Sequence, residues 1–165
     1  MISIALETLD VSHNNLTAVS ALLFHRSLSG SPTLRTSLSS VSFSHNDLHD
    51  IGAMLVIEAL LPCAMRKLAL AQCMLGETAG LCLAGTMIHW PLLASLDVHG
   101  NCLCSMSLVM METTLCENES ENKLMLFIGN WLLHGGEQEI ADILAAGKRG
   151  SVTLAHRKAP ATARA

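Results

Sequence analysis

Aromatic residues are scarce in this chain of 165 residues, which has two tryptophans, three phenylalanines and no tyrosine. Strands of a β-sandwich favour aromatic and β-branched residues, so this composition argues against that class. Half of the residues are nonetheless hydrophobic, and leucine, alanine and methionine supply most of them. The chain can therefore bury an aliphatic core in one domain or one short repeat array.

A targeting signal and a long hydrophobic run are also missing. The first residues, MISIALETLDV, have no basic start and include Glu7, unlike a signal peptide. The longest nearly apolar stretch, residues 51–65, contains Glu58 and Pro62 and is too short to cross a bilayer. The six cysteines lack the spacing of a secreted disulfide framework. We therefore expect reduced thiols, a cytoplasmic location and no membrane partner.

Motifs for catalysis are absent, and charge is unevenly placed. The chain has no G-x-S-x-G, H-E-x-x-H or Walker sequence, so we expect no enzyme, no catalytic residue and no cofactor. Residues 148–165 carry five bases and no acid, whereas residues 1–147 carry all fourteen acids. The basic end at 155–165 predicts a disordered tail. Such tails are usually solvated, and we expect no nucleic-acid partner.

What the chain has instead is a repeated phrase. LDVSHNNL at residues 9–16 returns as VSFSHNDL at 41–48 and as LDVHGNCL at 96–103. Aligned on the asparagine, each copy reads L-x-x-L-x-L-x-x-N-x-L with conservative changes. A further copy at 65–75 has Cys73 in place of the asparagine. Self-similarity at this period is typical of a solenoid, in which each unit supplies one short strand.

Two weaker copies follow. The fifth is degraded, with Met125 and Phe127 in leucine positions and Asn122 where the first leucine is expected. The sixth is a stub containing Val152 and Leu154. The copies predict strand centres at residues 9, 41, 68, 96, 125 and 152.

The segments between the copies repeat as well. A small residue stands six positions after each asparagine or Cys73, and apolar residues follow it at steps of four. A step of four marks one face of a helix, and the small residue would let that helix approach the strands closely. The pattern predicts helices near 18–28, 51–61, 78–88, 106–116 and 137–146.

The whole pattern resembles the leucine-rich repeat. The unit length, the alternation of asparagine with cysteine and the full helix are similar to the ribonuclease-inhibitor-like subclass. The resemblance implies an α/β leucine-rich-repeat solenoid, a right-handed βα superhelix of about five repeats. Its parallel strands would line the concave face and its helices the convex face. We assign residues 1–154 to this array, with extra connecting residues near 29–37, and 155–165 to the tail.

The asparagine position has a structural explanation. Its amide can satisfy backbone groups of the turn that no neighbouring strand reaches, and a cysteine can offer a weak S–H donor there. We predict a structural ladder of these side chains, formed by Asn14, Asn46, Cys73, Asn101 and Asn130.

Candidate metal ligands are few. His13 and His45 hold equivalent positions, so neighbouring units would bring them close, but later copies carry glutamine and glycine there. Cys102, Cys104 and Cys116 form one C-x-C pair with a distant third cysteine, whereas structural zinc sites usually use four ligands. We expect no metal site and structural or surface roles for these residues.

The resemblance implies protein binding on the concave face, because solenoids offer extended concave surfaces. The chain would then be a scaffold or regulatory protein-interaction module with a protein partner. The strand residues expected on that face are small, polar and slightly acidic, without an aromatic anchor. They are Asp10, Ser12, Ser42, Ser44, Ala69, Ala71, Asp97 and His99.

Two further expectations follow. The alternative function is a regulator of a small GTPase, by resemblance to the Ran GTPase-activating protein, although none of its functional residues can be matched here. The chain also begins almost inside a strand and has no capping repeat at either end, which is typical of a fragment of a longer array. An uncapped first strand flanked by Leu6, Leu9 and Val11 predicts self-association through the N-terminal edge.

Overall fold

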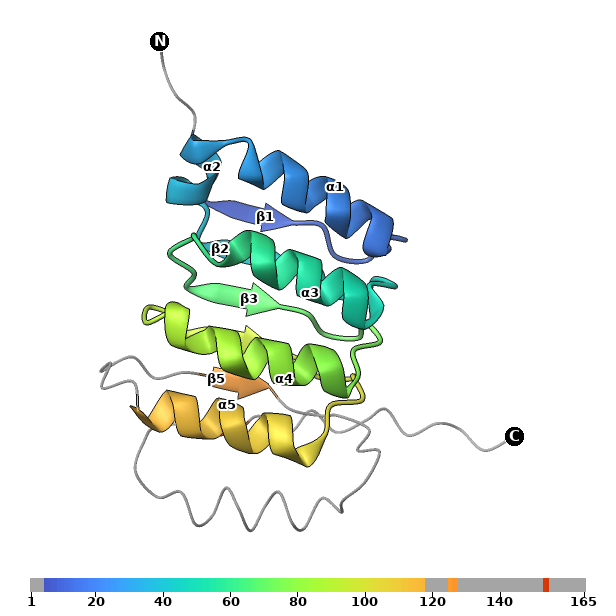
Figure 1. The fold of residues 1–165 in the computed structure, drawn as a ribbon, viewed down its shortest axis with the longest axis vertical. Coiled ribbons are helices and arrows are strands. Elements are labelled where there is room, and N and C mark those ends of the chain that lie inside the picture. The colour runs from blue at the N-terminus through green and yellow to red at the C-terminus, as the bar shows by residue number, and fades with distance from the viewer. Residues whose placement is uncertain (1–4, 118–124, 128–152, 155–165) are drawn as a thin grey trace.

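The computed structural model describes residues 5–117, 125–127 and 153–154. Short strands and helices alternate along this part of the chain (Figure 1). The strands are β1 (Thr8–Asp10), β2 (Ser40–Ser42), β3 (Lys67–Ala69), β4 (Ser95–Asp97), β5 (Met125–Phe127) and β6 (Thr153–Leu154). The helices are α1 (Ala18–Ser29), α2 (Pro32–Ser37), α3 (His49–Leu60), α4 (Glu77–Thr86), the 3₁₀ turn η1 (Met87–His89) and α5 (Ser105–Glu117).

The strands form one parallel sheet in the order in which they occur in the chain. Leu9 of β1 pairs with Val41 of β2, and Val41 pairs with Leu68 of β3. Leu68 in turn pairs with Leu96 of β4. The residues that align in the repeated phrase are thus the residues that pair in space. This confirms the predicted order and register of the first four strands.

The register of the last two strands differs from the prediction. Leu96 pairs with Leu126 rather than with Met125, and Leu126 pairs with Leu154 rather than with Val152. The fifth copy lacks its first leucine and was aligned on Met125, Phe127 and Asn130. Leu126 stands between the two apolar residues, so the apolar pattern does not distinguish this alignment from one shifted by a residue. Asn130, the predicted helix at 137–146 and the predicted tail at 155–165 lie outside the described residues.

The predicted helices at 18–28, 51–61, 78–88 and 106–116 agree with α1, α3, α4 with η1, and α5 to within two residues. One helix was not predicted. The extra residues near 29–37 include α2, which begins with Pro32. Proline is well suited to the first turn of a helix because the amide it lacks would have no helical partner there. Pro32 therefore starts α2, while α1 already ends before Gly30.

Helices α1, α3, α4 and α5 all cover the same face of the sheet (Figure 1). The core lies between the two layers, where Val41, Leu68 and Leu96 are almost completely buried. The small residues allow close packing, as predicted: a Cβ atom on Gly52 of α3 would lie 3.1 Å from Ala18 Cα of α1. None of the described helices is both long enough and apolar enough to cross a membrane.

The core is less well covered at the β1 end. Leu6 is 41 % exposed, whereas Leu38, which holds the same position in the second unit, is 2 % exposed. Leu9 and Val11 are only partly buried. Within the described residues, β1 pairs with β2 alone. The first unit therefore packs on one side only.

Candidate functional site

The predicted binding residues come together on the face of the sheet that points away from the helices, here called the outer sheet face. Asp10, Ser42, Ala69 and Asp97 pair in register and form one row across β1 to β4. Their neighbours in each strand point into the core, and side chains of a strand alternate between faces. The four residues therefore form one continuous row of small and polar side chains.

The parallel pairing continues two residues beyond the strands. The His13 amide donates to the Ser44 carbonyl at 2.9 Å, and the Gln72 amide donates to the His99 carbonyl at 2.8 Å. A second row formed by Ser12, Ser44, Ala71 and His99 therefore lies beside the first. Ser44 and Ala71 are buried, however, so they contribute to the structure of this row more than to its accessible surface.

Asp10 and Asp97 build the same small structure at the two ends of the first row. Asp10 Oδ1 accepts hydrogen bonds from the Ser12 amide at 3.0 Å and the Ser12 hydroxyl at 2.6 Å. The hydroxyl bond is the main reason why the pKa of Asp10 is lowered. Asp97 Oδ1 accepts from the His99 amide at 3.2 Å and lies 2.6 Å from His99 Nδ1. Both carboxylates are thus held in fixed orientations at the surface.

Three histidines gather where the strands end. The rings of His13 and His45 are stacked, with centroids 4.0 Å apart and planes at 15°. This confirms that equivalent positions bring the two together. His99 lies edge-on to His45 at 6.5 Å, and its participation was not predicted because it stands one residue earlier in its unit. The strand register, which places His99 beside Gln72, was the signal that could have revealed it.

The turn after each strand has an unusual backbone conformation. His13 and His45 have φ angles of 55° and 59°, and Gln72 at the same position has φ 50°. Glycine adopts positive φ more readily than other residues, and Gly100 occupies this position in the fourth unit with φ 67°. The repeated turn therefore fixes the direction in which the histidine rings leave the sheet.

The pKa of His45 is lowered, first by burial and then by repulsion from His13 and His99. His45 therefore favours its uncharged form. Within the described parts of the chain, no three histidine, cysteine or acidic side chains are grouped so that they could hold a metal ion.

Asn46 ties the second unit to the first. Its Nδ2 donates to the Phe43 carbonyl of its own unit at 2.7 Å and to the Val11 carbonyl of the first unit at 3.1 Å. Its Oδ1 accepts from the Leu16 amide at 3.0 Å. One buried amide thus satisfies backbone groups on both sides of the boundary between units.

Asn101 does the same between the third and fourth units. Its Nδ2 donates to the carbonyls of Leu70 and Val98 at 2.8 and 2.9 Å. Its Oδ1 accepts from the amides of Cys73 and Leu75 at 2.9 and 3.1 Å. These bonds follow the predicted role of the Asn ladder.

Cys73 takes the ladder position in the third unit. Its Sγ lies 3.1 Å from the Phe43 carbonyl of the second unit, so its thiol replaces one of the bonds that an asparagine would make. Burial raises the pKa of Cys73 to about 11, which keeps the thiol protonated and able to donate. Among the residues that the structure describes, Asn14 of the first unit bonds only to the carbonyls of Val11 and Ser12 in its own turn.

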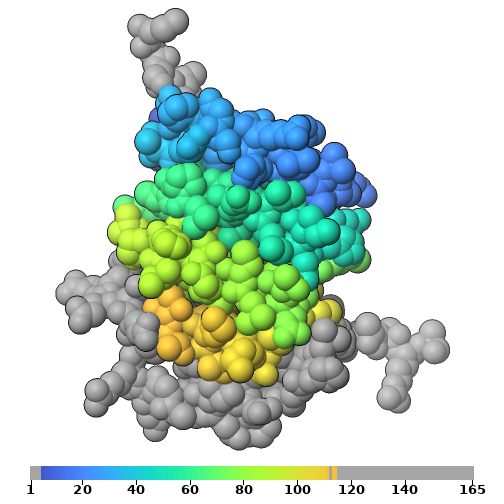
Figure 2. Space-filling view, viewed as in Figure 1, coloured from blue at the N-terminus to red at the C-terminus, as the bar shows by residue number. Residues whose placement is uncertain are grey.

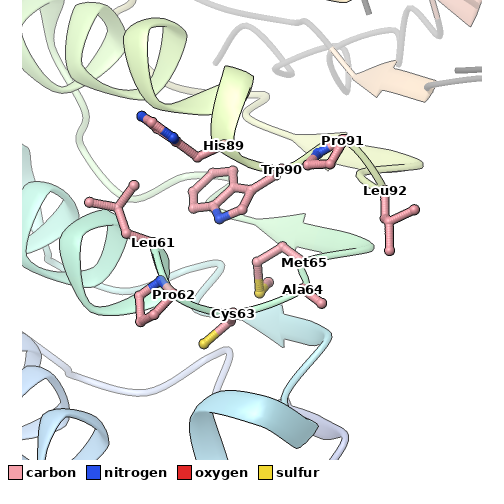
Figure 3. A pocket seen from close by; sticks show the side chains of 9 residues that line it. All are labelled: Leu61, Pro62, Cys63, Ala64, Met65, His89, Trp90, Pro91 and Leu92. Carbon is pink, nitrogen blue, oxygen red and sulfur yellow. The ribbon is translucent and has the colours of Figure 1, made fainter. Parts of the chain in front are cut away.

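A hollow of about 270 Å³ lies between two neighbouring connections from helix to strand, the one from α3 to β3 and the one from η1 to β4 (Figure 3). Trp90 is 1 % exposed and its Nε1 donates to the Leu60 carbonyl at 3.1 Å. It therefore anchors the end of the third unit, after η1, to the end of α3 in the second unit, a role that the sequence pattern did not indicate. The hollow is lined by Leu61, Pro62, Cys63, Ala64, Met65, His89, Trp90, Pro91 and Leu92.

Two comparisons with known proteins do not assign the chain to a family. The chain matches no model of a known protein family, and a search of curated proteins finds no significant match.

Proposed function

We propose that the chain is a protein-interaction module, a leucine-rich-repeat solenoid whose outer sheet face is the concave binding surface. The observation that carries this proposal is the in-register polar row formed by Asp10, Ser42, Ala69 and Asp97. A flat row of small and acidic side chains, with its carboxylates held in place, suits a partner that presents basic or hydrogen-bonding groups.

Three features of the described residues support the interpretation of the fold as a solenoid. The strands are parallel and in chain order, the connecting helices share one face, and the ladder residues bond across unit boundaries. Repetition of one unit against its neighbours is the organisation of a solenoid. The cytoplasmic location remains part of the proposal, supported by the free thiols of Cys63, Cys73, Cys82, Cys102 and Cys104. For the alternative function, a regulator of a small GTPase, no functional residue of such a regulator can be matched to a residue of this chain.

Affinity capture from a native cell extract tests the binding face. The bait is the full chain, and the test variant carries Asp10→Lys and Asp97→Lys on the outer sheet face. The matched control carries Glu58→Lys and Glu77→Lys, which change the net charge equally but lie on α3 and α4. We expect a protein that the wild type and the control retain and the test variant loses.

A partner retained equally by both variants would show that binding does not use the outer sheet face. Cross-linking of the captured complex locates the contact independently of the variants. We expect cross-links to Lys67, which begins β3 beside the polar row. Cross-links confined to other lysines would contradict the proposal.

A further inference from the structure

The outward surface of the helix layer is unusually apolar. Val19 on α1 is 68 % exposed, Ile51 on α3 is 69 % exposed and Met106 on α5 is 60 % exposed. All three stand five residues after the ladder residue of their unit, so they form a row across the helices. One turn further along, Leu23, Met54 and Met110 are also exposed. We call these six residues the apolar stripe.

The stripe lies on α1, α3 and α5 of the helix layer, which faces the viewer in Figure 2. Helix α4 contributes Leu81 and Cys82, which are partly buried, and one polar residue, Thr78, in the row of Val19 and Ile51. Helix layers of soluble proteins normally place polar residues on their outward side. An exposed apolar surface that spans several helices marks an interaction site.

We propose that the apolar stripe is the interface of a homodimer, in which the helix layers of two copies pack against each other. The stripe itself contains no charged residue, so the centre of such an interface holds no like-charge contact. Its residues on α1 and α5 lie at its two ends, so a two-fold axis near its middle pairs the apolar side chains of α1 with those of α5 in the other copy.

The size of the stripe agrees with such a dimer. Six half-exposed aliphatic side chains offer on the order of 400 Å² of apolar surface per copy. A standard interface buries about 800 Å² per partner and has an apolar core within a polar rim. The stripe therefore supplies the core of an interface and predicts a dissociation constant in the micromolar range.

Charges around the stripe argue against a lipid surface. Surface-bound helices usually carry lysine and arginine beside their apolar face. The residues beside this stripe are Arg26, Glu58, Asp50 and Glu77, which are mainly acidic. The β1 end is a smaller candidate surface for self-association, because Leu6 is exposed there but Leu9 and Val11 are partly buried.

A dimer of this kind leaves both outer sheet faces free, so the inference does not depend on the proposed partner-binding function. Sedimentation velocity of the full chain between about 1 and 200 µM tests it. We expect a monomer–dimer equilibrium that Ile51→Lys with Met106→Lys weakens at least about 30-fold. Leu6→Lys at the β1 end should leave the equilibrium unchanged. Circular dichroism verifies that each variant is folded.

A second variant tests the dimer by strengthening it, so the result does not depend on a substitution that disrupts the interface. Thr78→Val completes the most exposed row, and we expect it to tighten the dimer about three- to tenfold. A chain that stays monomeric at 200 µM would overturn the proposal. So would an association that survives the two lysines on the stripe but disappears with Leu6→Lys.

Discussion

At the scale of single residues, the ladder explains why one phrase recurs in the sequence. Each strand exit leaves backbone amides and carbonyls that neither a helix nor a strand partner can reach. A buried asparagine satisfies several of them at once, since its side chain both donates and accepts. Asn46 and Asn101 bond on both sides of a unit boundary, whereas Asn14 bonds only within its own turn. An asparagine at the same repeat position therefore contributes differently to stability in different units.

This difference predicts unequal effects of two matched substitutions. Asn46→Ala leaves the Leu16 amide without the Asn46 oxygen and removes the bonds to the Val11 and Phe43 carbonyls. It should lower the free energy of unfolding by about 1–3 kcal/mol. Asn14→Ala removes the same side chain from an exposed turn and should cost less than about 1 kcal/mol. Urea unfolding of both variants measures the difference. Equal losses would mean that the bonds across the boundary contribute nothing specific.

The histidine group predicts a pH dependence of stability. The pKa of His45 is lowered in the folded chain, so the unfolded chain binds the proton more tightly. Stability contributed by the neutral ring is present above the ordinary histidine pKa of about 6.5 and decreases as the pH falls below it. Asp97 opposes this effect because its charge favours a protonated His45, whereas His13 and His99 add to it.

We therefore expect the melting temperature to fall between pH 7.5 and 5.5, and to fall less in His45→Gln. Because His45 is only partly buried, the effect should be modest. Thermal melts at the two pH values provide the comparison. A larger decrease in the variant than in the wild type would reverse the predicted sign.

At the scale of elements, the sequence correctly predicts the strands and helices that recur in each unit, and the prediction is wrong where a unit departs from the repeat. The strand centres at 9, 41, 68 and 96 follow from aligned leucines, each supported by a ladder residue and a helix at fixed spacing. β5 was placed one residue early because its copy had lost the first leucine. Helix α2 was missed because it occurs in one unit only. The contacts of Trp90 and His99 were missed because they depend on packing between units, which no local pattern specifies.

Close contact between helices makes a second prediction at this scale. A side chain at Gly52 meets the backbone of Ala18 and the Cβ of Leu48, each at 3.1 Å. Gly52→Val should therefore push α1 and α3 apart and cost about 1–3 kcal/mol. Gly85 on α4 has no atom within 4 Å of a built Cβ, so Gly85→Val should change stability by less than about 0.5 kcal/mol. The midpoints of urea unfolding distinguish the two.

At the scale of the whole molecule, two layers offer two different surfaces. The outer sheet face carries carboxylates at both ends of its first row, and the helix layer exposes apolar side chains on α1, α3 and α5. A polar surface costs little when it is exposed and can recognise a partner through directed hydrogen bonds. An apolar surface is more stable when covered. The proposed partner and the proposed second copy therefore occupy opposite sides of the chain.

The central claim is that residues far apart in the sequence form one in-register row on the outer sheet face. Engineered cysteines test it directly, because neighbouring strands are about 4.8 Å apart and a disulfide needs Cα atoms about 4.4–6.8 Å apart. Ser42→Cys with Ala69→Cys should form a disulfide under mild oxidation, identified by peptide mass spectrometry. Ser42→Cys with Asp97→Cys, two strands apart, should not. A disulfide in the second variant and none in the first would contradict the register on which the binding face depends.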